Sequence, residues 1–425
     1  MNILVYIDPG TGSMLFTIAI GIISACVFFL RALLIKLKFV MSGGKSKTDK
    51  NANKEDYVIF SDSKRYWNVF KPVCDEFERR QIKISYYTAS PDDPALSEEY
   101  KFVNTEFIGE GNKAFSRLNM MKARVCLSTT PGLEVYQWKR SKDTDFYVHI
   151  YHAVDEGLGY RMFGVDFYDA ILLTGEFQED NIRKLEKLRS LPAKETCVTG
   201  STYLDSMKKR LDAAQAEGDS ASKTEGSLEA SGVKTVLLAP SWGESSILNR
   251  YGESILSALA ATGFNIVVRP HPQMAISDAG LLNELKEKYP ENDRFKWNSD
   301  NDNFECLRNA DVMITDFSGI IFDYCLVFNR PLIYADTSMD LSPYDASWID
   351  EPLWRLEILP KLGIKLNKDD FGDMRSIIDS LSESDEYRNG REEIRNTAWQ
   401  YIGESATKTV DYLVGKCTEI KDKEQ

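Results

Sequence analysis

The sequence has 425 residues, 43% of them hydrophobic and 28% charged, which is enough for two or three globular domains. The net charge of -13 argues against non-specific nucleic-acid binding, which needs a basic surface, but not against a small anion in a local positive pocket. Seven scattered cysteines without a CxxC pair are typical of free thiols in a reducing compartment, not of a disulfide framework or zinc site.

A long apolar segment occupies residues 14–30 (MLFTIAIGIISACVFFL), and no charge occurs between Asp8 and Arg31. About 20 such residues span a bilayer. Basic residues follow the segment, which predicts that its C-terminal side faces the cytoplasm. A cleaved signal peptide fits poorly because no Lys or Arg precedes the run, and the lipoprotein-like box at residues 23–26 is disfavoured because the run continues past it. We therefore expect residues 1–40 to hold one transmembrane helix, which would make this a single-pass protein of the cytoplasmic membrane with its globular body in the cytoplasm.

Two polar segments divide the rest of the chain. Residues 41–56 are rich in Gly, Ser and charge, and residues 213–232 are small, polar and low in complexity, so both are predicted linkers. The expected domains are an N-terminal domain at 57–212, a C-terminal domain at 233–380 and closing helices at 381–425.

Strand-like and helix-like stretches alternate in both domains. Such alternation indicates parallel sheets flanked by helices. The expected fold class is therefore α/β, with two Rossmann-like domains that face a cleft. The predicted strands are residues 57–60, 82–88, 123–129, 146–152 and 170–175 in the first domain and 235–241, 264–270, 311–316 and 331–336 in the second, with helical patterns at 66–80 and 179–190.

One of the three histidines, His271, lies between two prolines just after an apolar run, in VVRPHPQM (267–274). The prolines stiffen the loop, and ligands of open α/β sheets bind beyond the carboxyl ends of the strands. His271 is therefore a candidate ligand-binding residue, with Arg269 beside it. A histidine that only caps a turn is the alternative that this local pattern leaves open.

Residues 310–336 (ADVMITDFSGIIFDYCLVFNRPLIYAD) predict a strand ending at Asp316, a Ser-Gly turn and an apolar helix from about Ile320. Backbone N–H groups at a helix start favour an anion. Ser318 could donate its hydroxyl, and Gly319 would allow close approach of a phosphate. Spacing alone favours the simpler alternative, an ordinary helix N-cap.

The other two histidines fall in FYVHIYHAVDEG (146–157). Positions three apart point to opposite faces of a strand. We expect His149 to be packed in the interior. We expect His152, which is nearer the loop that contains Gly157 and Gly159, to be functional. The histidines are not at metal-ligand spacing, and the DxD-like residues 300–302 are better explained as a solvated loop, so we expect neither a metal nor a cofactor.

In combination, the motifs resemble the C-terminal half of the CDP-glycerol glycerophosphotransferase family, the wall teichoic acid primases and polymerases, which have a GT-B fold. The resemblance rests on VVRPHP, TDFSGIIFDY and RPLIY, described above. LLAPSW (237–242) is similar to the family's strand that ends in A-P-T-W, VTGSTYLD (198–205) to its V-x-G-x-x-R-x-D segment, and ESATKTVDYLV (404–414) to its closing helix. The resemblance extends over residues 147–414.

The resemblance implies roles for the matching residues. His271 corresponds to the family's essential HP histidine near the donor diphosphate, and His152 to the histidine that opens its H-G-T-P motif, a general base on the acceptor hydroxyl. Asp316, Ser318 and Asp323 fall on the pattern that holds phosphate and shapes the donor pocket. The remaining donor-side candidates are Arg269 and Gly319, with Ser241 and Gly200 as secondary ones.

The resemblance implies a membrane-anchored transferase. It would move glycerol phosphate, or a related polyol phosphate, from CDP-glycerol to a hydroxyl of a lipid-linked or cell-envelope polymer and release CMP. The sequence departs from the family pattern at three places. Ala-Val-Asp follows His152, where the family's usual lysine has no counterpart, Gly319 replaces a second serine, and Gly-Glu follows Trp242. They leave two alternatives open, a GT-B nucleotide-sugar glycosyltransferase of envelope polysaccharide synthesis and a catalytically inactive nucleotide-binding scaffold.

Overall fold

The computed structural model describes residues 54–154, 157–216, 232–300 and 302–424. The predicted transmembrane segment and most of both predicted linkers lie outside these residues, so the anchor stays a prediction. Within the described ranges, no helix combines the length and apolar character that a membrane crossing requires.

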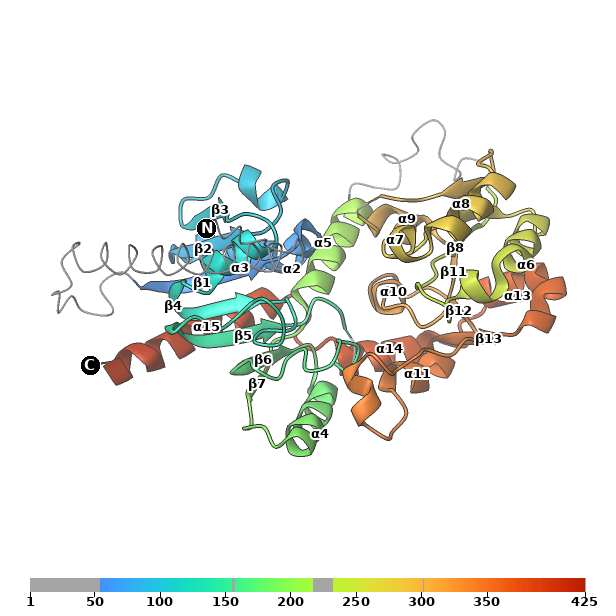
Figure 1. Ribbon diagram of the computed structural model, residues 1–425. Coiled ribbons are helices and arrows are strands. Elements are labelled where there is room, and N and C mark those ends of the chain that lie inside the picture. The colour runs from blue at the N-terminus through green and yellow to red at the C-terminus, as the bar shows by residue number, and fades with distance from the viewer. Residues whose placement is uncertain (1–53, 155–156, 217–231, 301, 425) are drawn as a thin grey trace, which may run out of the picture. The chain divides into compact units, whose positions relative to one another are not determined.

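Seven parallel strands form the first sheet, in the order β3-β2-β1-β4-β5-β6-β7 (Figure 1). Its five predicted strands are confirmed, whereas the edge strands β3 and β7 were not predicted. Both edge strands are half-exposed and lack a continuous apolar run. The strands are β1 (Glu55–Ser61), β2 (Ile84–Thr88), β3 (Val103–Phe107), β4 (Lys122–Ser128), β5 (Asp143–Ile150), β6 (Ala170–Leu173) and β7 (Glu195–Val198).

The second sheet has six parallel strands, in the order β10-β9-β8-β11-β12-β13. The four strands predicted here are again the central ones, and the two edge strands were missed. The strands are β8 (Thr235–Leu238), β9 (Asn265–Val268), β10 (Phe295–Trp297), β11 (Val312–Thr315), β12 (Leu332–Ala335) and β13 (Gly363–Leu366).

Helices cover both faces of the first sheet. Successive residues of a strand point to opposite faces, so Ile59 packs in one hydrophobic cluster and Phe60 in another. The cluster around Ile59 contains residues of α2 and α15, and that around Phe60 contains residues of α3 and α4. These helices are α2 (Trp67–Arg79), α3 (Asn112–Leu118), α4 (Glu179–Arg189) and α15 (Ser405–Glu424).

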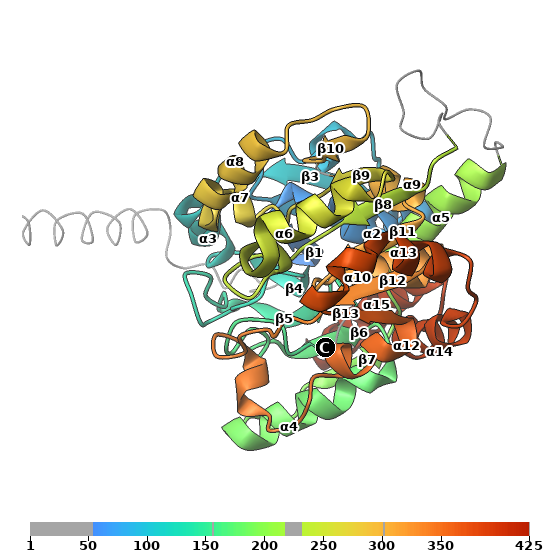
Figure 2. The ribbon, with the colours of Figure 1, turned by 90° about the vertical axis from the view of Figure 1, so that its right-hand side faces the viewer.

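The second sheet is covered in the same way. Helices α6, α7 and α8 lie together over one face, with α13 in the same cluster (Figure 2). The other face packs against α9, α10, the π-helix that follows α10, α12 and α14. The elements are α6 (Ile247–Ala261), α7 (Met274–Ser277), α8 (Ala279–Lys288), α9 (Phe304–Asn309), α10 (Ile320–Phe322), the π-helix (Asp323–Phe328), α11 (Trp354–Glu357), α12 (Leu359–Leu362), α13 (Met374–Ser382) and α14 (Arg388–Ala398), with 3-10 turns at Lys64–Tyr66, Pro94–Ser97, Glu176–Gln178, Asp345–Trp348 and Lys368–Asp373.

Two helices connect the domains. Helix α5 (Thr202–Ala216) donates a hydrogen bond from Thr202 Oγ1 to the Val69 carbonyl of α2, and its Leu204 packs in a cluster of the second domain (Figure 1). Helix α15 returns to the first sheet, where its Val410 and Leu413 are buried. The chain therefore crosses between the domains twice, once before the second sheet and once after it.

Candidate active site

A pocket of about 360 Å³ lies beyond the carboxyl ends of four strands of the second sheet. Because the sheet is parallel, the loops after its strands meet at one edge. The loop after β8 contributes residues 241–245, the loop after β9 His271 and the loop after β11 residues 317–319. The loop after β12 contributes Met339, Asp340, Pro343 and Tyr344. Gly159 of the first domain and Arg355 complete the lining. The predicted candidates His271, Ser241, Ser318 and Gly319 therefore share one pocket.

The ring of His271 both caps a turn and lines the pocket. Its Nδ1 accepts a hydrogen bond of 3.1 Å from the Gln273 amide, which places the proton of the neutral ring on Nε2. Burial, assisted by the charges of Arg65 and Arg269, lowers the pKa of His271 to about 4. The histidine is thus neutral at cellular pH and can donate a hydrogen bond from Nε2 to an anion. The two alternatives for His271, binding a ligand and capping a turn, therefore do not exclude each other.

Asp316 is buried next to the pocket loop after β8 and is only 2% exposed. Its carboxylate accepts hydrogen bonds from the amide of Ser241 at 3.0 Å and from that of Ile247, the first residue of α6, at 2.9 Å. Burial raises the pKa of Asp316, although these amides act in the opposite direction. Asp316 therefore fixes the loop between β8 and α6 and is not among the lining residues.

Ser318 and Gly319 form the pocket wall at the start of α10. No side-chain hydrogen bond caps α10, so the simple N-cap alternative for Ser318 is not what the structure has. A Cβ atom added at Gly319 would meet nothing within 4 Å among the described residues. The space would accept the serine of the family pattern, so steric crowding does not explain this departure.

Three other donor-side candidates lie away from the pocket lining. The Arg269 guanidinium contacts the Asn298 side chain and donates 2.8 Å to the Asp300 carbonyl, so it acts on His271 through its charge. Asp323 is buried and accepts hydrogen bonds of 3.0 Å from Tyr203 and from Asn303; burial raises its pKa to about 7.

Gly200 packs against the crossover to α15: a Cβ there would be 2.3 Å from the Gln400 carbonyl oxygen and 2.5 Å from Ser405 Oγ.

His152 follows β5 and does not line the pocket. Its Nδ1 lies 3.0 Å from Thr129 Oγ1, and its ring centroid is 4.7 Å from that of Tyr66. Arg65, the neighbour of Tyr66, is close enough to His271 for its charge to lower the pKa of that histidine. The segment after β1 therefore lies near both histidines. Because this segment follows the end of a strand, Arg65 could have been predicted as a site residue from its position. No sequence motif marks Arg355.

His149 is buried and packed, as expected. Among the described residues, no group of three or more His, Cys, Asp or Glu side chains could hold a metal ion. Of the DxD-like residues, Asp302 forms an ion pair of 2.7 Å with Arg210, and residue 301 lies outside the described ranges.

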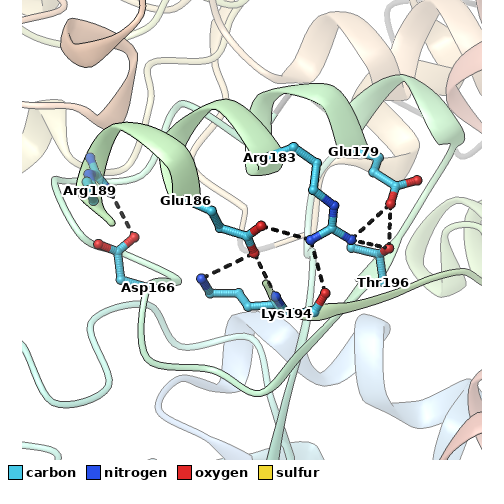
Figure 3. A network of polar contacts seen from close by, with 7 residues as sticks. All are labelled: Asp166, Glu179, Arg183, Glu186, Arg189, Lys194 and Thr196. Atoms are coloured by element: carbon cyan, nitrogen blue, oxygen red, sulfur yellow. Dashed lines mark hydrogen bonds and ion pairs between the residues drawn. The ribbon is translucent and has the colours of Figure 1, made fainter. Parts of the chain in front are cut away.

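The pocket wall after β12 is held against the first domain by a buried arginine. Arg189, the last residue of α4, pairs with Asp166 at 2.7 Å and with Asp345 at 2.6 Å, and all three side chains are at most 5% exposed. Its guanidinium lies 4.7 Å from the Phe163 ring centroid and 4.9 Å from that of Trp348. Figure 3 shows the pair with Asp166 and, nearer the start of α4, a second network that ties Arg183 and Glu186 to the start of β7.

Residues 183–352 match the model of the CDP-glycerol:poly(glycerophosphate) glycerophosphotransferase family. The predicted family resemblance is confirmed over this range. The matched range contains His271, Asp316, Ser318 and Asp323, and it ends just beyond the pocket wall after β12. His152 lies outside it. No curated protein matches the sequence.

Solved structures similar to this chain confirm the α/β architecture with two parallel sheets, which resembles GT-B enzymes. The UDP co-structure of MnaA from S. aureus has a TM-score of 0.55 at 13% identity and covers 86% of this chain and 98% of its own. UDP-GlcNAc 2-epimerase from Neisseria meningitidis bound to UDP-GlcNAc has a TM-score of 0.55 at 14% identity, over 85% of this chain and 100% of its own. The Methanocaldococcus jannaschii UDP-GlcNAc 2-epimerase in complex with UDP-GlcNAc and UDP has a TM-score of 0.53 at 15% identity, with the same coverage.

Proposed function

We propose that the protein transfers glycerol phosphate, or a related polyol phosphate, from CDP-glycerol to a hydroxyl of a lipid-linked or cell-envelope polymer and releases CMP. The observation that carries the proposal is that the family match over residues 183–352 includes His271 and the loops around it at the strand-end pocket. That position is where open α/β sheets bind their ligands.

The reaction is an attack of the acceptor hydroxyl on the β-phosphorus of the donor. A new P–O bond forms to the acceptor, the bond between the β-phosphorus and the bridging oxygen breaks, and CMP leaves. His152 takes the hydroxyl proton as general base. His271, neutral with its proton on Nε2, donates a hydrogen bond to a diphosphate oxygen, and Ser318 and Arg355 face the same pocket.

Membrane attachment through residues 1–40 belongs to this proposal. A lipid-linked acceptor stays at the bilayer, and an anchored enzyme meets it at a raised effective concentration. Extraction of membranes at alkaline pH tests the attachment: the full-length protein should remain in the pellet, and release into the supernatant would contradict a spanning helix.

The activity is tested with the full-length protein, a lipid-linked acceptor and a panel of CDP-glycerol, CDP-ribitol and common nucleotide-sugars. We expect release of CMP from CDP-glycerol, and its loss in His271→Ala with the circular dichroism spectrum unchanged. Turnover of a nucleotide-sugar alone would favour the glycosyltransferase alternative. Binding of nucleotides without turnover of any donor would favour the inactive scaffold.

A further inference from the structure

The side chain of Tyr160 bridges the two histidines of the FYVHIYH segment. Its hydroxyl oxygen lies 3.1 Å from Nε2 of His149 and 3.3 Å from Nδ1 of His152. Nδ1 of His152 is also 3.0 Å from Oγ1 of Thr129. A chain of polar contacts therefore runs from the interior of the first domain to the predicted base.

The interior end of this chain is fixed by packing. His149 is 0% exposed, and its ring centroid lies 5.3 Å from those of Tyr151 and Tyr160 and 4.9 Å from that of Tyr168. Burial lowers the pKa of His149 well below its ordinary value, so this histidine is neutral. Its Nδ1 has no hydrogen-bond partner within the described part of the chain, so the contact between Nε2 and the Tyr160 hydroxyl is the hydrogen bond of this ring there.

The backbone around Tyr160 is fixed by the wall of the donor pocket. The Tyr160 carbonyl accepts a hydrogen bond of 2.9 Å from the Asp345 amide, and Arg161 forms an antiparallel bridge with Tyr344, which lines the pocket. The residue that contacts both histidines therefore belongs to a segment paired with the loop after β12.

We propose that Tyr160 is a positioning residue for His152. In the proposed arrangement the Tyr160 hydroxyl donates its hydrogen to Nε2 of His149, so the proton of neutral His149 lies on Nδ1, and the Tyr160 oxygen accepts a hydrogen bond from Nδ1 of His152. The proton of neutral His152 is thereby kept on Nδ1, and its lone pair lies on Nε2, where it can take a proton from the acceptor hydroxyl. The role of His152 as base rests on the proposed function; the hydrogen-bond arrangement itself does not.

NMR of the histidine ring nitrogens shows directly which nitrogen of each ring carries the proton. The sequence has only three histidines, so a long-range ¹H–¹⁵N spectrum of the full-length protein with ¹⁵N-labelled histidine, in mild detergent, contains three ring patterns. We expect Nδ1 of His152 to be protonated and Nε2 of both His152 and His149 to be unprotonated at neutral pH. In Tyr160→Phe, which keeps the aromatic ring, we expect His152 to redistribute between its two tautomers.

Tyr66→Phe is the matched control, because it also removes a hydroxyl from a ring that contacts His152. We expect its spectrum to keep the wild-type tautomer. The proposal is overturned if wild-type His152 carries its proton on Nε2, if Tyr160→Phe leaves the His152 pattern unchanged, or if both variants change it equally. The wild-type spectrum decides the matter alone if Tyr160→Phe does not fold.

Kinetics add a second measurement. With CDP-glycerol as donor, we expect Tyr160→Phe to lower kcat by roughly 10- to 100-fold with little change in the donor KM, since the variant misplaces a base without touching the donor. An equal kcat would overturn the positioning role. If the wild-type protein does not turn over CDP-glycerol, the proposed function fails, and the tautomer of His152 still decides the arrangement proposed for Tyr160.

Discussion

Arg189 and Asp345 form a buried ion pair, with 2.6 Å between Nη2 and Oδ1, that joins the end of α4 to the loop forming one wall of the pocket. The two residues are 156 positions apart in the sequence. Asp166 shares the same guanidinium, so a single arginine compensates two carboxylates that are removed from water.

Replacement of this arginine should be strongly destabilising. Arg189→Met keeps an apolar stem between the Phe163 and Trp348 rings but leaves both carboxylates without their partner. We expect the free energy of unfolding to fall by about 3–5 kcal/mol. Lys184→Met, which removes exposed pairs of the same helix with Asp180 and Glu351, should cost less than about 1 kcal/mol. Denaturant unfolding compares the two variants, and equal losses would contradict the importance of burial.

The low pKa of His271 makes stability depend on pH. The histidine has a pKa of about 4 in the folded protein and an ordinary value near 6.5 in the unfolded chain, so between these values the unfolded chain binds more protons. The free energy of unfolding therefore decreases as the pH falls through this window. His271→Gln should reduce that slope by up to about 1.4 kcal/mol per pH unit.

The measurement is denaturant unfolding of wild type and His271→Gln at several pH values from 4 to 7. His149, whose pKa is also lowered by burial, keeps a residual slope of the same sign in the variant. If the free energy of unfolding changes with pH in the same way in both proteins, the pKa of His271 is not lowered in the folded state.

Loss of the Asp316 carboxylate should loosen the loop between β8 and α6. In Asp316→Asn an amide group faces the backbone donors of Ser241 and Ile247, so buried hydrogen bonds are lost. We expect a loss of about 1–3 kcal/mol in stability and, through the displaced loop, roughly tenfold weaker binding of CDP. Calorimetric titration with CDP measures the second effect.

Asp278→Asn is the control for this variant, because Asp278 accepts a longer hydrogen bond of 3.3 Å from Gly243 of the same loop and is less buried. It should bind CDP almost as the wild type does. Equal weakening in the two variants would argue that Asp316 has no special role in the loop.

Two glycines with nearly the same positive φ allow the cost of backbone strain to be separated from the cost of steric crowding. Gly200 has a φ of 84° and Gly403 a φ of 83°, which L side chains rarely adopt. A Cβ at Gly403 meets nothing within 4 Å of the described chain, so Gly403→Ala should cost about 1–2 kcal/mol. Gly200→Ala adds overlap with the Gln400 carbonyl and should cost about 2–5 kcal/mol in all. Equal losses of stability in thermal unfolding of the two variants would rule out the close approach between residue 200 and the Gln400 carbonyl.

The central strands of both sheets could be predicted because they are buried on both faces and read as continuous apolar runs. The four strands that were missed, β3, β7, β10 and β13, are the edges of the two sheets. An edge strand has one neighbour and more exposed side chains, so a sequence such as VNTEF in β3 carries no apolar pattern.

The candidate site was predictable where a motif marks a strand end. His271 is such a case, because the prolines and the apolar run ahead of it fix its place on a stiff loop beyond β9. Asp323 shows the limit: its motif is real, but which way its side chain points depends on Tyr203 and Asn303, which lie 120 and 20 positions away. The ion pair between Arg189 and Asp345, which are 156 positions apart, likewise forms only when distant elements pack together.

The return of α15 to the first sheet bears on how the protein is made. The ribosome completes β7 at Val198, but the helix that buries Val410 and Leu413 against this sheet begins only at Ser405. At the usual rate of translation, the roughly 200 residues between them take about 10–40 s to emerge. Throughout that interval the part of this face that α15 covers in the finished protein stays exposed beside α2, which makes the nascent first domain a natural client for chaperones and leaves chains that terminate early open to proteolysis.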